Sequence, residues 1–203
     1  MSANTQIVES FWLARPSTSV APDLLGCTLV RQFPDGETMR GMIVETEAYG
    51  PGDPACHAYR QRTSRNEVMF GPPGMSYVYL IYGIYHCFNV VTDGEGVASA
   101  VLVRALQLDA VPQEFAGIPD KKRSRLAAGP GKLCKVLKID RTLSGFPLGA
   151  GQSLRLEHRS EHFQQAVEEG TISFVQTTRI GISQGIDLPW RWYVGNSTAV
   201  SQL

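Results

Sequence analysis

The chain has 203 residues, of which 43% are hydrophobic and 19% are charged, and its formal net charge at pH 7 is zero. These values are ordinary for a soluble globular protein, and the length suits one large domain or two small ones. The apolar runs are too short to span a bilayer, and the first residues lack the pattern of a signal peptide. The four cysteines include no CxxC pair, which favours reduced thiols in a cytosolic protein over a disulfide framework.

The N-terminal half predicts a short helix, a hairpin and a long loop, in that order. Residues 7–15 read as a helix or a docking arm, and residues 23–26 resemble a helix end capped by glycine. Apolar and β-branched residues predict strands over 27–31 and 38–49, joined by a turn that contains Pro-Asp-Gly. Residues 51–74 form a long irregular stretch, and loops of that length are uncommon unless they are functional.

The second half continues with strands and one helix. Strand-like segments occur at residues 76–81, 85–92, 98–106, 148–156, 173–177 and 190–194. A helix is expected over 132–138, after a Gly-Pro-Gly sequence. We therefore predict an α+β fold in which residues 1–203 form a single mixed domain, with a curved, mainly antiparallel sheet and peripheral helices. Residues 1–20 are a candidate for a loosely ordered N-terminal arm.

Tyr77, Tyr79 and Tyr82 lie in a run of strand-forming residues that ends at Gly83. Side chains alternate between the two faces of a strand, so Tyr77 and Tyr79 share one face. Tyr82, beside the glycine, is expected near the tip of a hairpin. Tyrosines in strands are usually core or sheet-face residues, and this segment alone favours that interpretation.

Two carboxylates, Glu45 and Glu47, lie in the hydrophobic strand 38–49 and, by their spacing, point to the same face. The loop that follows carries His57, so one interpretation is a general-base site at the end of this strand. Spacing alone favours the other interpretation, in which both glutamates lie on the exposed face of a half-buried strand.

Arg104 and Asn89 are polar residues inside otherwise apolar strands. Arg104 either lies on an exposed face or pairs with an acid, for which Glu45 and Glu47 are natural partners. Asn89 requires hydrogen-bond partners or a ligand. For each residue taken alone, a structural role is favoured over a functional one.

Basic residues are concentrated in residues 121–141 and at Arg60, Arg62 and Arg65. On a neutral chain such segments either contact phosphates or form a solvated surface. The Cys-His pairs at residues 56–57 and 86–87 lack the spacing of zinc sites, so no metal site is expected.

Taken together, these short motifs closely resemble the alkyladenine (3-methyladenine) DNA glycosylase family. The matching segments are residues 21–26, 43–49, 53–57, 62–66, 69–74, 77–83, 88–91, 101–106, 129–134 and 178–182. Each segment is short, but their ordered combination is specific and extends over nearly the whole chain. The chain departs from the family at Ser64, where proline is common, at Met75, where bacterial relatives often have histidine, and at Cys56, where relatives carry a small residue.

The resemblance implies a monofunctional DNA glycosylase of base excision repair, a hydrolase acting on N-glycosyl bonds. Its partner would be double-stranded DNA containing damaged purines, namely 3-methyladenine, 7-methylguanine, hypoxanthine or ethenoadenine. The enzyme would insert a β-hairpin into the DNA, flip the damaged nucleotide out and hydrolyse its glycosidic bond. It would act as a monomer, without a cofactor, a metal or a membrane, in the cytoplasm at the nucleoid, or in the nucleus of a eukaryote.

The resemblance also assigns roles to residues. Glu47 is expected to be the general base that activates water for attack on the sugar C1′, with Arg104 and the backbone carbonyl of Ile180 holding that water. The base pocket is expected to contain Tyr49, His57, Tyr79 and Asn89, of which Asn89 crowds out the 2-amino group of guanine. Tyr82 is expected to intercalate into the DNA, with Ile84 beside it. The expected contacts to the DNA backbone are Arg60, Arg62, Arg65 and Lys132.

Two other classes of protein are also compatible with these residues. A non-catalytic nucleic-acid binding module would use tyrosine stacking and the basic stretch, and would bind damaged and undamaged DNA equally. A small-molecule hydrolase would use Glu47 on an unrelated polar substrate and would be indifferent to DNA.

Overall fold

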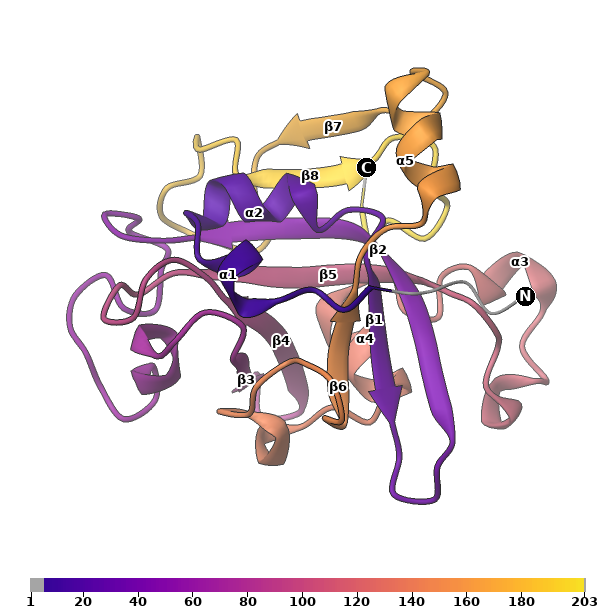
Figure 1. Ribbon diagram of the computed structural model, residues 1–203, viewed down its shortest axis with the longest axis horizontal. Helices are drawn as coiled ribbons and strands as arrows, with labels where there is room; N and C mark the ends of the chain where they lie inside the picture. Colours follow the sequence, from indigo (N-terminus) through magenta and orange to yellow (C-terminus); the bar gives the residue numbers. More distant parts are fainter. Residues whose placement is uncertain (1–5, 203) are drawn as a thin grey trace.

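The structure, a computed structural model, describes residues 6–202, in which a curled antiparallel sheet carries short helices at its margin (Figure 1). The sheet has eight strands: β1 (Thr28–Gln32), β2 (Thr38–Tyr49), β3 (Ser76–Ile81), β4 (Tyr85–Val91), β5 (Ala100–Leu108), β6 (Leu154–Glu157), β7 (Phe174–Thr177) and β8 (Arg191–Val194). The helices are α1 (Ser10–Leu13), α2 (Ser17–Asp23), α3 (Asp120–Arg123), α4 (Pro130–Val136) and α5 (Glu161–Glu168), with 3₁₀ turns η1 (Glu67–Phe70), η2 (Gln113–Phe115) and η3 (Arg141–Leu143). This architecture confirms the predicted α+β fold class.

The long strand β2 organises the sheet. One of its edges pairs with β5, and the other pairs first with β1 over residues 38–42 and then with β8 over residues 45–47. The register with β5 shifts between Ile43 and Thr46, and such a bulge bends a strand locally. Strands β5 and β8 therefore cover both edges of β2 over residues 45–47, where the side chains are fully buried.

The core packs on the sheet in two clusters. In the main cluster, α2 packs on β2 and β5 while α4 packs on β4 and β5, and Leu24, Phe88 and Leu133 are fully buried. A smaller cluster around Met69 and Tyr77 lies under the long loop that follows β2. This second cluster anchors the loop against the hairpin of β3 and β4.

The β3–β4 hairpin turns at Tyr82 and Gly83, whose φ angles of 51° and 72° are both positive. The N–H of Ile84 closes the turn by donating to the carbonyl of Ile81 at 3.2 Å. Positive φ at both central residues is typical of a type I′ hairpin turn, but it is rare for a side chain as large as tyrosine. The turn holds Tyr82 outward, with 84% of its surface exposed.

The structure corrects the sequence-based description of two helices. Helix α2 ends at Asp23 with Leu24 as its C-cap, so Gly26 is not the cap but follows in a turn with a φ of 86°. A Cβ atom on Gly26 would lie 2.2 Å from the ring of Phe163 on α5, so close packing excludes a side chain there. Helix α5 was not predicted, although Ser160 marks its start by accepting a hydrogen bond from the N–H of Phe163.

The N-terminal segment is packed against the sheet over residues 6–20. The N–H of Val8 donates to the carbonyl of Leu156 at 2.9 Å, and Leu13 and Val20 are fully buried. Residues 1–5 of the expected arm lie outside the described residues. In residues 6–202, each helix is too short or too polar to cross a membrane.

Candidate active site

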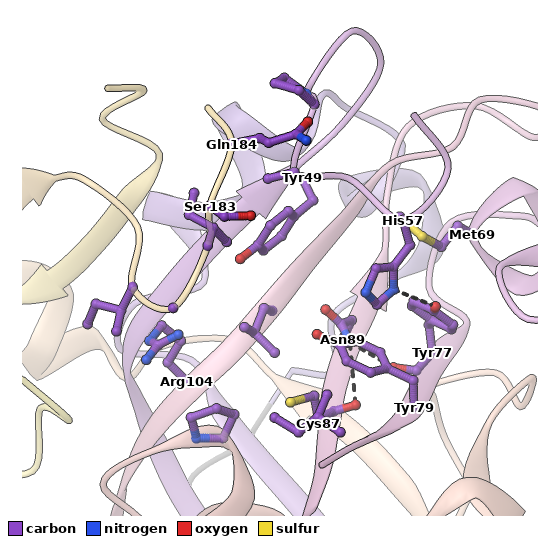
Figure 2. A pocket seen from close by; sticks show the side chains of 18 of the residues that line it. Tyr49, His57, Met69, Tyr77, Tyr79, Cys87, Asn89, Arg104, Ser183 and Gln184 are labelled. Atoms are coloured by element: carbon purple, nitrogen blue, oxygen red, sulfur yellow. Dashed lines mark hydrogen bonds between the residues drawn. The ribbon is translucent and has the colours of Figure 1, made fainter. Parts of the chain in front are cut away.

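A cavity of about 490 Å³ opens where the β3–β4 hairpin faces the C-terminal end of β2 (Figure 2). Pockets for small ligands have volumes of roughly 300–1,000 Å³, so a flipped base could enter it. The predicted site residues that line it are Tyr49, His57, Tyr79, Tyr82, Asn89, Arg104 and Ile180. Segments far apart in the sequence thus meet around one cavity. Glu47 does not line the cavity itself but lies directly behind its wall.

Aromatic rings form two sides of this cavity. Figure 2 shows Tyr49 on one side and His57, Tyr77 and Tyr79 on the other. The rings of His57 and Tyr79 meet edge to face with centroids 4.4 Å apart. The space between Tyr49 and this cluster is suited to a planar ring system, because aromatic faces stack on planar ligands.

His57 is held in place by Tyr77, to which only a core role was given from the sequence. Nδ1 of His57 lies 2.9 Å from the hydroxyl of Tyr77. Partial burial of the imidazole, with a smaller contribution from the nearby Arg65, lowers the pKa of His57. The ring is therefore neutral at pH 7, and Nδ1 is engaged, which leaves Nε2 for a ligand.

Asn89 lies in the cavity with its amide fixed by the hairpin (Figure 2). Its Nδ2 donates to the backbone carbonyl of Tyr77 at 3.0 Å and, more weakly, to that of Cys87 at 3.4 Å. The residue is buried, so the hydrogen-bond partners expected for a polar residue in an apolar strand are present. The fixed amide limits which atoms a ligand can place beside it.

Glu47 is fully buried and has three polar partners, one ion pair and two hydrogen bonds, each with a residue that lines the cavity. Nη1 of Arg104 lies 3.1 Å from Oε1, and the backbone N–H of Ile180 donates to the same oxygen at 2.8 Å. The hydroxyl of Tyr49 donates to Oε2 at 2.7 Å. The structure thus places Arg104 and Ile180 beside Glu47, and the contact of Ile180 with the carboxylate is made by its amide. The role of the Ile180 carbonyl in holding a water stays a prediction.

Glu45 is also fully buried, so the interpretation of an exposed glutamate pair is wrong. The carboxylate accepts hydrogen bonds from Nε of Arg104 at 3.3 Å and from Nε of Arg191 at 2.8 Å. The N–H and the hydroxyl of Ser201 also donate to it, at 2.7 and 2.9 Å. Of the two alternatives for Arg104, the structure shows the pairing with an acid, and it does so for both glutamates.

A second buried ion pair, between Arg179 and Asp53, supports Tyr49 from behind and was missed in the sequence. Nη2 of Arg179 lies 2.8 Å from Oδ1 of Asp53, and Nη1 donates to the carbonyl of Ala48 at 2.9 Å. The guanidinium carbon lies 4.7 Å from the centroid of the Tyr49 ring. Both residues fall in the matching segments 53–57 and 178–182. The position of Arg179 next to Ile180, a predicted site residue, was the signal in the sequence that it lies near the site.

The four basic residues expected at the DNA backbone are all exposed, but some of them contact other side chains of the protein. Arg62 pairs with Glu67, with Nε 2.8 Å from Oε2. Arg65 lies over Tyr79, 5.9 Å from its ring centroid, and Arg60 lines a shallow hollow next to the cavity. Lys132 is exposed on α4, whose first residue, Pro130, lines the cavity.

In residues 6–202, no three His, Cys, Asp or Glu side chains are grouped so that they could hold a metal ion. The departures at Cys56 and Met75 lie in or against the small core cluster beneath the loop, and Ser64 is exposed on that loop. None of these three residues contacts Glu47.

Comparison with known proteins gives a consistent result over the whole chain. The family model described as methylpurine-DNA glycosylase (MPG) matches residues 11–198. A protein of Trichodesmium erythraeum is 58% identical over 98% of this chain and 100% of its own length, and one of Synechococcus sp. strain JA-3-3Ab is 55% identical over 94% of this chain and 96% of its own. One of the archaeon Methanoculleus marisnigri is 47% identical over 93% and 95%. Each is named "Putative 3-methyladenine DNA glycosylase".

Proposed function

The chain belongs to the methylpurine-DNA glycosylase family, and from this premise we propose that it excises 3-methyladenine, 7-methylguanine, hypoxanthine and ethenoadenine from double-stranded DNA. It is a hydrolase acting on N-glycosyl bonds, and its substrate is DNA. The observation that carries the proposal is the position of Glu47, a buried carboxylate whose three donors all belong to the wall of an aromatic cavity.

Glu47 acts as the general base in this proposal. A carboxylate has about four acceptor positions, and Arg104, Ile180 and Tyr49 occupy three, so one remains for a water. That water bonds to the sugar C1′ through its oxygen while the bond from C1′ to the purine nitrogen breaks, its electron pair leaving with the base. Glu47 accepts the proton of the water, and Arg104 offsets the charge of the carboxylate.

The aromatic walls would hold the flipped base. A purine alkylated at N3 or N7 is positively charged, and a cationic ring is attracted to the faces of Tyr49 and Tyr79. Nε2 of the neutral His57 would bond to the edge of the base. Asn89, which lines the cavity with its amide fixed by the Tyr77 carbonyl, would exclude the 2-amino group of normal guanine.

The hairpin tip would open the duplex. Tyr82 is exposed at the rim of the cavity, and Ile84, 69% exposed, is beside it. An apolar side chain inserted between base pairs replaces the stacking of a nucleotide that has left the helix. The energetic cost of flipping is smallest for a damaged or mismatched base, which adds to selectivity.

The test is an excision assay on a duplex that carries one hypoxanthine or one 3-methyladenine, run in the presence of EDTA. We expect base release from both lesions and a strand break only after treatment with hot alkali, as for a monofunctional enzyme that uses no metal. An undamaged duplex of the same sequence is the control. Equal binding of both duplexes without any base release would contradict the proposal and would support a non-catalytic binding module.

A further inference from the structure

Glu45 is a fully buried carboxylate to which the proposed reaction gives no role. Four donors surround it: Nε of Arg104, Nε of Arg191, and both the N–H and the hydroxyl of Ser201, at distances from 2.7 to 3.3 Å. A carboxylate buried so completely requires such partners, because an unpaired charge in the interior is expensive. The question is what this cluster does beside Glu47.

Arg104 joins the two carboxylates. Its Nε lies 3.3 Å from Glu45, and its Nη1 lies 3.1 Å from Glu47. Because the guanidinium is planar and rigid, fixing Nε on Glu45 also fixes the direction in which Nη1 points. The orientation of Arg104 toward Glu47 and the cavity therefore depends on Glu45.

Glu45 is fixed in turn from the far side. Arg191 comes from β8, and a second nitrogen of its guanidinium donates to the carbonyl of Gln202. Arg125 holds the same segment by donating to the carbonyls of Val200 and Ser201 at 3.1 and 3.0 Å. Arg125 and Arg191 thus hold residues 200–202 in place, so that Ser201 can contact Glu45.

The charges of this network balance. Glu45 and Glu47 are matched by Arg104 and Arg191, and the neighbouring Asp53 is matched by Arg179. The other titratable groups that face Glu47 are Tyr49, Tyr79 and Cys87. Removing the charge of Glu45 would therefore leave a net positive charge close to Glu47, and removing the charge of Arg191 would leave a net negative charge there.

We propose that Glu45, Arg191 and Ser201 are positioning residues, which orient Arg104 toward Glu47 and keep the buried network neutral. The inference rests on the proposed role of Glu47 as the base. It adds a segment near residue 201 to the parts of the chain that determine the rate of base release.

The two charge variants are expected to change the pH dependence in opposite directions. Glu45→Gln leaves an excess positive charge, which favours the ionised form of a nearby carboxylate. The acidic limb of the profile of excision rate against pH should therefore move to lower pH. Arg191→Gln leaves an excess negative charge, and the limb should move to higher pH. We expect shifts of about one pH unit and, for Glu45→Gln, a roughly tenfold lower plateau rate, since Arg104 loses its orientation. The double variant should return the limb toward that of the unaltered protein.

Single-turnover rates with saturating protein on a hypoxanthine duplex, measured from pH 5 to pH 9, give these values. Lesion affinity and thermal unfolding are measured on the same samples, because a merely structural role would change unfolding without opposite shifts of the pH limb. Shifts in the same direction, or none, in folded variants overturn the proposal. Glu47→Gln separates the two levels. If it is inactive while the other variants behave as the unaltered protein, only the present inference fails, and if it releases the base at the original rate, the proposed role of Glu47 as the base fails.

Ser201→Ala keeps the proposal testable if the charge variants do not fold. It removes one hydrogen bond to Glu45 without changing the charge, so we expect excision to slow several-fold with lesion affinity and the pH limb unchanged. Ser197→Ala is the matched control, because the hydroxyl of Ser197 contacts the N–H of Ala199 and not Glu45. Equal rates for both serine variants would overturn the role of Ser201.

Discussion

At the scale of single residues, Tyr49 contributes to both parts of the site. Its ring faces the cavity, with the guanidinium of Arg179 behind it, and its hydroxyl donates to Glu47. Burial, together with the negative charge of Glu47, raises the pKa of Tyr49 well above its ordinary value. The hydroxyl therefore stays protonated and remains a donor over the whole working pH range.

Tyr49→Phe should separate these two contributions. It keeps the ring and removes only the hydroxyl that orients Glu47, so we expect excision to slow by about 10- to 100-fold, as for loss of a hydrogen bond to a charged group. Affinity for lesion duplex should change little because stacking is retained. Single-turnover rates and binding titrations measure the two effects. Tyr193→Phe on β8 is the control, and a Tyr49→Phe enzyme as fast as the unaltered one would contradict the role of the hydroxyl.

His57 provides a second check at this scale. Burial and the positive charge of Arg65 both lower the pKa of its imidazole, since each disfavours the charged form. Arg65→Gln removes one of these causes, so the pKa of His57 should rise. NMR titration of the His57 ring signals would detect the change, with the signals of His162 on α5 as an internal reference. A pKa that stays constant or falls would show that Arg65 does not act on this ring.

At the scale of elements, the β3–β4 hairpin carries the proposed duplex-opening function on one strained turn. Tyr82→Ser should weaken binding to a hypoxanthine duplex by about tenfold or more, because the gap left by the flipped nucleotide would stay empty. Binding to a single-stranded oligonucleotide with the same lesion should change little, since no stack has to be opened. Phe11→Ser, which alters another exposed aromatic residue, is the control. Equal losses on both substrates would argue against intercalation.

The elements also show what a sequence can and cannot reveal. Strands over residues 38–49 and 76–81 were predicted with the bounds that the structure has, because their aromatic and β-branched residues give a strong local signal. Helix α5 was missed because most of its residues are polar and only Phe163 is buried.

Burial at the site depends on contacts between distant parts of the chain. Glu45 was expected to be exposed because its partner Arg191 is 146 residues away, in a strand that covers the edge of β2. The pairing of Arg104 with the glutamates could be anticipated, since a charged residue in an apolar strand requires an acid. Asp53 and Arg179 both fall in the matching segments 53–57 and 178–182, but the sequence could not show that they pair, because neither residue lies within a strand and their contact spans 126 residues.

At the scale of the whole molecule, a chain with no net charge has to present a basic face to DNA. Two arginines of the basic stretch 121–141 make contacts within the protein. Arg123 pairs with Asp120, and Arg125 donates to the carbonyls of residues 200 and 201. Of the residues expected at the DNA backbone, Arg60 lines the hollow next to the cavity, Arg65 lies over Tyr79 of the cavity wall, and Lys132 is exposed on α4. DNA affinity should therefore depend on a few phosphate contacts and not on an extended charged surface.

Lys132→Gln tests this view of the surface. Loss of one phosphate contact should lower the slope of log affinity against log salt concentration by about 0.9. The loss should be the same for damaged and undamaged duplexes, because phosphate contacts carry no information about the base. Lys121→Gln on α3, which removes an equal charge elsewhere on the surface, should leave the slope unchanged. If both variants have the same slope, Lys132 does not contact the DNA backbone.

The most direct test of the account as a whole is the rate at which Glu47→Gln releases hypoxanthine from duplex DNA under single-turnover conditions. The substitution keeps the shape of the side chain and removes its ability to accept a proton, so we expect the rate to fall by about 10²- to 10⁴-fold while lesion affinity is retained. Glu37→Gln, an exposed residue in the turn before β2, is the matched control. A Glu47→Gln enzyme that folds, binds the lesion and releases the base at the original rate would contradict the assignment of Glu47 as the general base.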